Sequence, residues 1–512
     1  MSSSNAELSA LAFEPSGAWL GSDGIWSGFT ISVGTPPQNF TVLPATNAQH
    51  IYIPAADDCK RIPRFDCASS RGVGAFDNAR SLGFQANASS TWKLIGLHEV
   101  GLNQNLAWSG NGVTGYETIG FGDDDKVPDR GKVMDGEVVT AYVTPDIWVG
   151  LLGLGGSSIT YREGERVGSF ISHLKEKRII PSESFGYTAG ASYRSTKIPA
   201  SLTLGGYDQT RISTPITIPL SKDTANPVSL SLQKIVVSNS PNGTLSLLTD
   251  AILTPIDSSV PELWLPEPVC DRFASLFSLE YQNASGRYAI SPSTREKLKE
   301  LSPTFTFTVA DSLVGGKSTN IDLPYAAFDL EATYPIFANA TRYFPIRRAA
   351  NDSQFAIGRA FLQEAYIAVD YERERFDIGQ ASFATPMPEP DIVTIRPAND
   401  TAELSSRIEK NEMSAGEIAG AAIGAVLAAG MLVAIVWYVF FRRRRGGHGD
   451  AESMGQEKSM KLRSESEVGG VMVGELPEYH GHSEVAGKDI AIEVSGKSIA
   501  YEMEGSSPID NR

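Results

Sequence analysis

Residues 45–54 read ATNAQHIYIP and residues 257–266 read DSSVPELWLP, and the two stretches align without a gap at an offset of 212 residues. Each follows an apolar run and ends in an apolar, an aromatic and an apolar residue before proline. This order is typical of a strand, a tight polar turn and a second strand. The repeat predicts two similar β lobes that arose by duplication. Chance similarity between β segments is the alternative.

The chain around this repeat, up to about residue 386, has the pattern of an all-β protein. Short runs of Val, Ile, Thr, Phe and Tyr are broken by Gly, Pro, Asn or Asp at a spacing of about 8 to 12 residues. A second matching pair, WVG at 148–150 and AIG at 356–358, is predicted to complete each copy. Helical patterns are few, and the best candidates are residues 167–177, 268–279 and 293–301.

The predicted organisation has six parts. They are a lead segment at 1–24, an amino β lobe at 25–220, a carboxyl β lobe at 221–387, a stalk at 388–417, a transmembrane helix at 418–441 and a disordered cytoplasmic tail at 442–512. The stalk loses the hydrophobic pattern, and the tail is polar and rich in Ser, Glu and Gly.

Residues 418–441 carry no charge and are long enough, at about 1.5 Å per residue, to cross a hydrocarbon core of about 30 Å. Four arginines follow directly and place that end in the cytoplasm. A buried helix of a soluble domain is the alternative. Gly416, Gly420 and Gly424 have the spacing of small-residue helix contacts and predict self-association through this segment, although small residues are also common in membrane spans.

The glycosylation sequons agree with a membrane protein whose part up to residue 417 lies outside the cytoplasm. All seven N-x-[ST] sequons precede residue 418. Asn39 lies in a strand-like run that does not suit a glycan, and the predicted acceptors are Asn87, Asn242, Asn283, Asn339, Asn351 and Asn399. Residues 1–24 contain no visible signal peptide. We therefore expect the natural protein to carry a leader that this sequence lacks.

Charge and cysteine content exclude two classes of function. The 512 residues include 60 acidic and 44 basic side chains, and the net charge of −16 repels phosphate backbones, so no nucleic-acid partner is expected. The three cysteines and six histidines show no C-x-x-C or H-x-x-x-H spacing, so we predict no metal site. No cofactor is expected either.

Equivalent polar turns at the centre of two β lobes suit one chemistry. A carboxylate from each turn shares a proton, so that one acts as general base on a water and the other as general acid on a carbonyl. The segment GTPPQ at 34–38, the strand up to Leu43, the turn and residues 51–54 resemble the amino-lobe signature of pepsin-like aspartic peptidases, which reads GTPPQ, D-T-G-S-S and WVP.

The resemblance covers about residues 26–385 and implies an all-β, bilobal pepsin-like fold. The other matching segments are SSTW at 89–92, GYET at 115–118, GLLGLG at 150–155, LTLGGYD at 202–208, IGRAFL at 357–362, and residues 366–370 and 376–381. The segments IDSSVPELWLP and YFPIRRAANDSQFAIGRAFLQEAY further resemble a membrane-anchored fungal branch of the family.

The amino-lobe motif departs from the family at its catalytic position. The family's D-T-G falls on ATN at 45–47, so Ala45 replaces the first catalytic aspartate, and Ala48 replaces the serine that follows. Asn47 tolerates the left-handed conformation that the family's glycine serves. The catalytic pair implied by the resemblance is therefore incomplete.

The carboxyl-lobe motif keeps Asp257, whereas Ser259 replaces its glycine. Thr46 and Ser258 are predicted to make paired hydroxyl-to-backbone contacts that hold the two turns together. Without a like-charged partner, Asp257 is expected to titrate as an ordinary, partly buried carboxylate. Losing one member of a catalytic set costs several orders of magnitude in rate, which favours a structural role for Asp257 over residual catalysis.

Other family positions also change. Residues 93–115 contain no tyrosine where the family carries its flap tyrosine, and Trp108 or Asn105 is predicted to take that place. Asp57 and Asp58 lie beyond the second strand, too far away to replace the missing carboxylate. The resemblance also implies a loop disulfide between Cys59 and Cys67. Cys270 is then a buried free thiol or, alternatively, part of an intermolecular bridge.

Three functions are compatible with these residues. The first is a catalytically inactive surface protein, a pseudopeptidase, whose interlobe cleft binds a peptide, a protein or another ligand. The second is a membrane-anchored aspartic endopeptidase that uses Asp257 and a water in impaired proteolysis. The third is a structural surface module whose cleft has filled. Because Ala45 removes one catalytic carboxylate, the sequence favours the functions without catalysis.

Overall fold

The computed structural model describes residues 8–62, 64, 66–122, 133–162 and 165–399. Within these ranges no helix is both long enough and apolar enough to cross a membrane. The predicted span at 418–441, the tail at 442–512 and the three glycines proposed for self-association lie outside the described residues.

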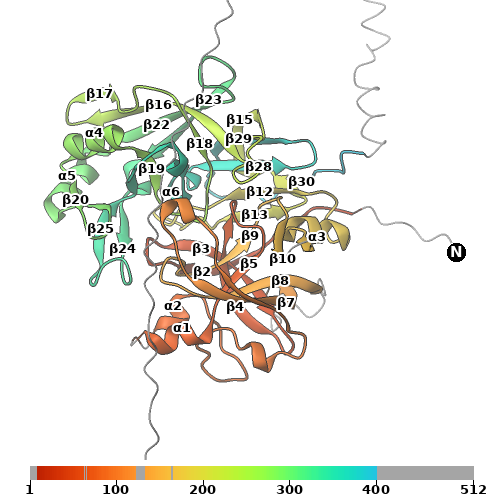
Figure 1. Ribbon diagram of the computed structural model, residues 1–512. Coiled ribbons are helices and arrows are strands. Elements are labelled where there is room, and N and C mark those ends of the chain that lie inside the picture. The colour runs from red at the N-terminus through yellow and green to blue at the C-terminus, as the bar shows by residue number, and fades with distance from the viewer. Residues whose placement is uncertain (1–7, 63, 65, 123–132, 163–164, 400–512) are drawn as a thin grey trace, which may run out of the picture. The chain divides into compact units, whose positions relative to one another are not determined.

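The amino lobe is built on one eight-stranded sheet, drawn mostly in red and orange in Figure 1. In spatial order its strands are β2 (Pro15–Leu20), β3 (Trp26–Val33), β4 (Gln38–Ala45), β9 (Gly150–Gly153), β5 (Ile51–Pro54), β8 (Val133–Val143), β7 (Asn111–Phe121) and β6 (Lys93–Glu99). The central strands β4, β9 and β5 are almost wholly buried. The apolar runs of β5 and β9 therefore reflect burial on both faces.

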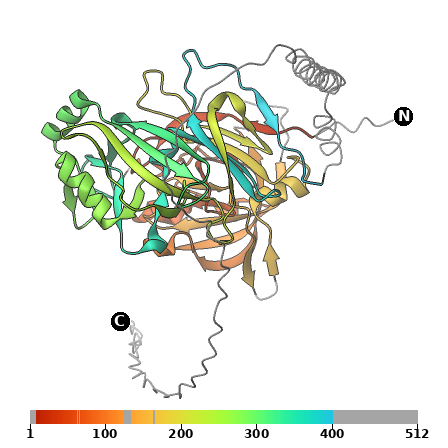
Figure 2. The ribbon, with the colours of Figure 1, turned by 90° about the horizontal axis from the view of Figure 1, so that it is seen from above.

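The carboxyl lobe uses smaller sheets, which appear in green and teal in Figures 1 and 2. One sheet holds β16 (Ser229–Ser240), β17 (Gly243–Ser246), β18 (Ile252–Pro255), β22 (Thr304–Ala310) and β23 (Ser318–Pro324); a second holds β19 (Leu263–Pro266), β26 (Ile346–Ala349) and β27 (Ala356–Ile357); a third holds β20 (Glu280–Gln282), β21 (Arg287–Ala289), β24 (Leu330–Ala332) and β25 (Thr341–Phe344). In β22 the alternation TFTFTVA buries Phe305, Phe307 and Val309 on one face.

A six-stranded sheet joins the two halves of the chain. Its order is β1 (Leu11–Phe13), β13 (Ser201–Leu204), β12 (Ser184–Thr188), β28 (Ala365–Asp370), β29 (Arg375–Ala381) and β15 (Ile212–Pro219). At its centre Phe185 of β12 pairs with Val369 of β28. Backbone hydrogen bonds therefore connect the two halves in this sheet. The buried hydrophobic residues of both lobes also form one continuous core.

Two predicted boundaries are corrected by strand pairing. Residues 11–20 of the predicted lead segment are not separate from the lobes, because β1 pairs with β13 and β2 pairs with β3. The first part of the predicted stalk also belongs to the fold, because β30 (Ile392–Thr394) pairs with β14 (Gly206–Asp208). Sequence composition misses both cases, since a short edge strand needs only a few residues that match its neighbour.

The three predicted helices are present with slightly different bounds. They are α3 (Phe170–Glu176), α4 (Glu267–Phe277) and α5 (Pro292–Leu301). Ser169 caps α3 by accepting a hydrogen bond from the Ser172 amide, and Ser291 caps α5 in the same way with Thr294.

The remaining elements are short. They are α1 (Ala56–Arg61), α2 (Cys67–Ser70), α6 (Arg359–Leu362), the hairpin β10 (Ile159–Arg162) with β11 (Glu165–Val167), and the 3₁₀ turns Ala86–Ala88, Gln104–Leu106, Gln209–Arg211, Tyr325–Ala327 and Asp352–Gln354.

The strand register confirms the internal repeat and corrects its second half. Ile51 pairs with Leu152, and Leu263, which lies 212 residues after Ile51, pairs with Ile357. Gly153 is therefore the equivalent of Gly358, so the predicted match at 148–150 lies three residues too early.

Close backbone packing explains why both of these positions are glycine. A Cβ on Gly153 would lie 2.5 Å from the His50 carbonyl oxygen, and one on Gly358 would lie 2.4 Å from the carbonyl oxygen of Glu262. His50 and Glu262 are themselves 212 residues apart, so the same contact recurs in both lobes.

Candidate functional site

The two repeated turns meet where the two lobes join. The amide of Thr46 donates to Ser258 Oγ at 2.9 Å, and the amide of Ser258 donates to Thr46 Oγ1 at 3.0 Å. Each hydroxyl then donates onward to a backbone carbonyl of the other lobe, Ile256 for Thr46 and Pro44 for Ser258, both at 2.8 Å. These four buried hydrogen bonds form a symmetric clasp between the lobes.

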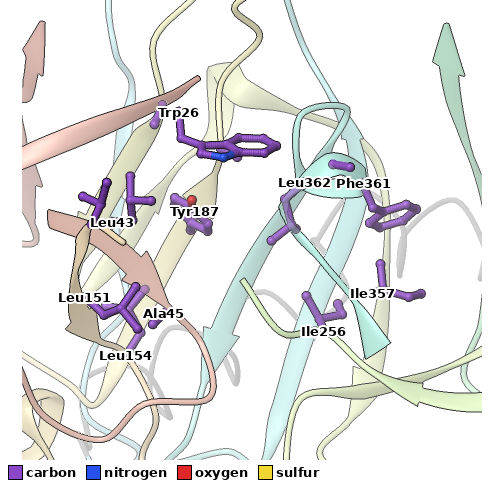
Figure 3. Close-up of a cluster of buried hydrophobic side chains, with 14 of the residues drawn as sticks. Trp26, Leu43, Ala45, Leu151, Leu154, Tyr187, Ile256, Ile357, Phe361 and Leu362 are labelled. Atoms are coloured by element: carbon purple, nitrogen blue, oxygen red, sulfur yellow. The ribbon is translucent and has the colours of Figure 1, made fainter. Parts of the chain in front are cut away.

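Ala45 stands where the amino lobe would present its carboxylate. Its side chain is fully buried at the end of β4. Figure 3 shows it beside Leu151 and Leu154, and its carbonyl accepts a hydrogen bond from the Leu154 amide at 2.9 Å. The position is therefore apolar and closed.

Asp257, at the equivalent turn, is buried with 3% of its surface exposed, which is deeper than the partial burial expected from the sequence. Its Oδ1 accepts hydrogen bonds from the amide of Ser259 at 2.9 Å and from the hydroxyl of Ser259 at 2.5 Å. Burial raises the pKa of the Asp257 carboxyl above its ordinary value, and the hydrogen bonds from Ser259 oppose that shift.

Asn103, which the sequence analysis missed, bridges the two turns. It lies in the loop at residues 100–110 that connects β6 to β7, called the flap loop below. Its Nδ2 donates to Ser259 Oγ at 2.6 Å, and its Oδ1 accepts from Asn47 Nδ2 at 3.1 Å. Asn103 has a left-handed φ of 51°, which asparagine tolerates better than most residues. The tolerance of asparagine for this conformation, within a loop rich in amide side chains, is the only local feature of the sequence that could have pointed to Asn103.

Asn105 and Trp108, the residues predicted to replace the flap tyrosine, connect the flap loop to the carboxyl lobe. Asn105 Nδ2 donates to the Ser353 carbonyl at 2.6 Å, and its own carbonyl accepts from Gln354 Nε2 at 2.6 Å. Trp108 packs on a small apolar cluster whose members are Leu106, Val260, Trp264 and Ala356. The flap loop is thus fastened across the cleft.

Arg359 holds the backbone of the Asp257 turn, and the sequence did not indicate this role. Its guanidinium donates to the carbonyls of Ser258 at 2.8 Å and Ser259 at 2.7 Å, and it pairs with Asp23 at 2.9 Å. It also lies 5.0 Å from the centre of the Trp26 ring. The turn that carries Asp257 is therefore held by a buried cation of its own lobe.

The other nearby carboxylates are used elsewhere. Asp57 is exposed and pairs with Lys60 at 2.7 Å. Asp58 is buried in an ion pair with Arg71, whose guanidinium also donates to the carbonyls of Thr144 and Ile147. These contacts agree with the expectation that neither aspartate replaces the carboxylate missing at residue 45.

The cysteines follow the prediction. Cys59 and Cys67 form a disulfide, with an S–S distance of 2.04 Å. Cys270 is a buried free thiol, and burial raises its pKa to about 12. Among the described residues, no cluster of three His, Cys, Asp or Glu side chains is arranged to hold a metal ion.

The predicted glycan acceptors are accessible. Six sequon asparagines are exposed, namely Asn87, Asn242, Asn283, Asn339, Asn351 and Asn399. Asn39 is half-buried within β4 and pairs there with Ser32 of β3.

A cavity of about 640 Å³ lies beside the closed flap loop, mainly on the amino-lobe side. Its wall includes Asn47, His50, His98, Asn103 and Tyr161, whereas Asp257 is not part of it. His50 is buried, and burial lowers its pKa to about 3, so its ring is neutral over the physiological range. This cavity offers space for a ligand next to the flap loop, and Asp257 does not line it.

Comparison with known proteins agrees with this architecture. The Eukaryotic aspartyl protease family matches residues 28–382. The aspartic proteinase yapsin-3 of Saccharomyces cerevisiae is 23% identical over 374 residues, which cover 69% of this chain and 66% of that protein. The chain thus spans just under two thirds of the length of this relative. Given the bilobal fold, the paired turns and the match over most of the two-lobed unit, the chain belongs to the eukaryotic aspartyl protease family.

Proposed function

We propose that this protein is a single-pass membrane homologue of aspartic peptidases that lacks peptidase activity and binds a ligand in its cleft at the cell surface. The observation that carries the proposal is that Ala45 and Asp257 occupy equivalent positions, one on each side of the clasp. The family uses a carboxylate at both positions. The proposed ligand is a peptide, a protein or another molecule, which is bound and not hydrolysed.

The chemistry of the site supports this proposal. Peptide hydrolysis in this family requires two carboxyl groups that together hold a water, accept its proton and protonate the scissile carbonyl. Ala45 supplies a methyl group, and Asn103 places a carboxamide against Ser259 where substrate would approach. A carboxamide neither accepts nor releases a proton at physiological pH. Asp257 alone therefore lacks a partner for general acid–base catalysis.

Membrane anchoring is part of the proposal and rests on the sequence. The uncharged segment 418–441 and the arginines after it support a span with the tail at 442–512 in the cytoplasm. The six exposed sequon asparagines support an extracellular or lumenal location for the two-lobed unit.

An assay of acid proteolysis tests the loss of activity. The full chain and its Asp257→Asn variant are incubated with mixed peptide libraries between about pH 3 and pH 6, the range in which a carboxyl pair would share one proton. We expect equal background cleavage by both proteins, with no effect of a transition-state mimic of aspartic peptidases. Ala45→Asp alone should restore little, because Asn47, Ala48, Ser259 and Asn103 also alter the site. Cleavage that disappears in Asp257→Asn would establish a membrane-anchored endopeptidase instead.

The fastened flap loop favours a second candidate, a structural surface module. Asn103 and Asn105 hold the loop to both turns and to the carboxyl lobe, which narrows access to the cleft. A structural module needs no ligand, so the two candidates differ in whether the cavity beside the loop is occupied in the working protein.

A further inference from the structure

The cavity beside the flap loop is separated from the Asp257 turn. Asn103 and Asn105 line the cavity and also make the hydrogen bonds that close the loop onto Asn47, Ser259 and Ser353. An extended chain running along the cleft would have to break all of these contacts. A compact ligand needs to break none of them, so the closed loop selects for compact occupants.

The lining of the cavity is polar but nearly uncharged. Glu99 is the only Asp, Glu, Lys or Arg among the described residues that line it. Six of the polar groups are carboxamides, which both donate and accept hydrogen bonds; they belong to Asn47, Gln49, Asn103, Gln104, Asn105 and Asn226. A ligand rich in hydroxyl groups can pair with such amides without leaving a charge unpaired, whereas an anion would face Glu99 with no lysine or arginine in the described lining.

Aromatic rings form the inner wall. His50 stacks on Tyr52 with ring centres 4.4 Å apart, and the Tyr161 ring lies 5.2 Å from the ring of His98. The hydroxyl of Tyr161 is 3.0 Å from the His50 ring nitrogens, and His50 Nε2 is 3.1 Å from Thr140 Oγ1. Such rings with polar edges provide a flat, amphipathic surface.

His98, which lines the cavity, carries a ring nitrogen without a hydrogen-bond partner among the described residues. That nitrogen is Nε2, and it is buried. An unpaired buried group of this kind is unfavourable, and a ligand hydroxyl is the kind of partner that would satisfy it. The cavity is therefore lined by a residue with an unused hydrogen-bonding atom, His98, as well as by aromatic rings.

We propose that this cavity binds a neutral oligosaccharide of two or three sugar units, held by the carboxamides, by His98 Nε2 and by the Tyr161 ring. The inference rests on the proposed non-catalytic function and names its ligand class. A volume of about 640 Å³ lies in the range of small-molecule sites and suits such a compact ligand. Ser353, which lines the cavity, also belongs to the sequon of Asn351, so the sugar can come from outside or from a glycan on the chain itself.

Binding to free trisaccharides tests the proposal on the full chain in detergent. The probes are cellotriose, laminaritriose, mannotriose and chitotriose, and an acetylated tripeptide amide of similar size is the comparator. We expect at least one trisaccharide to bind with a Kd between about 1 μM and 1 mM. His98→Ala should weaken it about tenfold, because one buried hydrogen bond is lost. Tyr161→Phe, which keeps the ring, should weaken it less, and Tyr281→Phe, outside the cavity, should leave it unchanged.

Two further arms separate the sources of the sugar. If the chain's own glycan occupies the cavity, trisaccharide binding should appear only after enzymatic deglycosylation or in Asn351→Gln. If the sugar comes from outside, untreated and deglycosylated protein should bind equally.

Three results would overturn the proposal. They are an absence of trisaccharide binding in both the deglycosylated chain and Asn351→Gln, unchanged binding in a folded His98→Ala variant, or tripeptide binding that depends on His98. None of these results bears on catalysis, because the acid proteolysis assay measures that separately.

Discussion

Asp257 is a buried carboxyl group, and its burial has a consequence for stability. Because burial raises its folded-state pKa above the unfolded value, the native state holds this proton to higher pH than the unfolded chain. The stabilising contribution is complete below the unfolded pKa and is lost as pH rises through the folded pKa.

Asp257→Asn should remove this loss, because an amide has no charge to desolvate. We expect the variant to unfold at a higher temperature than wild type at pH 7 and at a similar temperature near pH 3. Thermal unfolding at both pH values measures the difference. Asp250→Asn, an exposed position, is the control and should show no such pH dependence. An Asp257→Asn variant less stable than wild type at pH 7 would show that the ionised carboxylate is stabilising.

The hydroxyl of Thr46 is the second residue-scale feature. It accepts from the Ser258 amide and donates to the Ile256 carbonyl. Thr46→Val keeps the shape but leaves the buried Ser258 amide unpaired, which should lower the free energy of unfolding by about 1–3 kcal/mol. Thr46→Ser retains the hydroxyl and should lose much less. Denaturant unfolding compares the two, and equal losses in both would mean that the methyl group, rather than the clasp, matters.

At the scale of elements, the flap loop is held by few but specific contacts. β6 and β7 present it, Leu106 anchors it in an apolar cluster, and Asn103 and Asn105 bond it across the cleft. Segments fastened by a handful of hydrogen bonds open locally without global unfolding.

Asn103→Ala should therefore speed amide hydrogen exchange in residues 100–110 roughly tenfold, as expected for losing about 1–1.5 kcal/mol of hydrogen bonding. Gln104→Ala is the matched neighbour, because its exposed side chain makes only a 3.4 Å contact with Glu99. It should leave exchange nearly unchanged. Equal exchange in wild type and Asn103→Ala would mean that the loop is already open in solution.

At the scale of the whole molecule, glycosylation reports on which side of the membrane the two-lobed unit lies. Enzymatic deglycosylation of the natural protein should increase its gel mobility, because six exposed sequon asparagines are available. Asn87→Gln should remove one step of this shift, whereas Asn39→Gln should not, since Asn39 is half-buried in β4. Unchanged mobility after treatment would contradict an extracellular or lumenal location.

The sequence by itself determined the features that local pattern encodes. The repeat at 45–54 and 257–266 and the three longer helices follow from self-similarity and residue periodicity. The replacement at Ala45 was recognised through the family resemblance. The pairing of Cys59 with Cys67 came from the family resemblance instead.

Only the tertiary structure decided what fills the site. Asn103 meets Ser259 across 156 residues of sequence, and Arg359 reaches two carbonyls about 100 residues earlier. The full burial of Asp257 depends likewise on neighbours from distant segments. Such contacts depend on where packing places a loop or a side chain, and the path of a loop is set by the apolar residues that anchor it rather than by its own polar sequence.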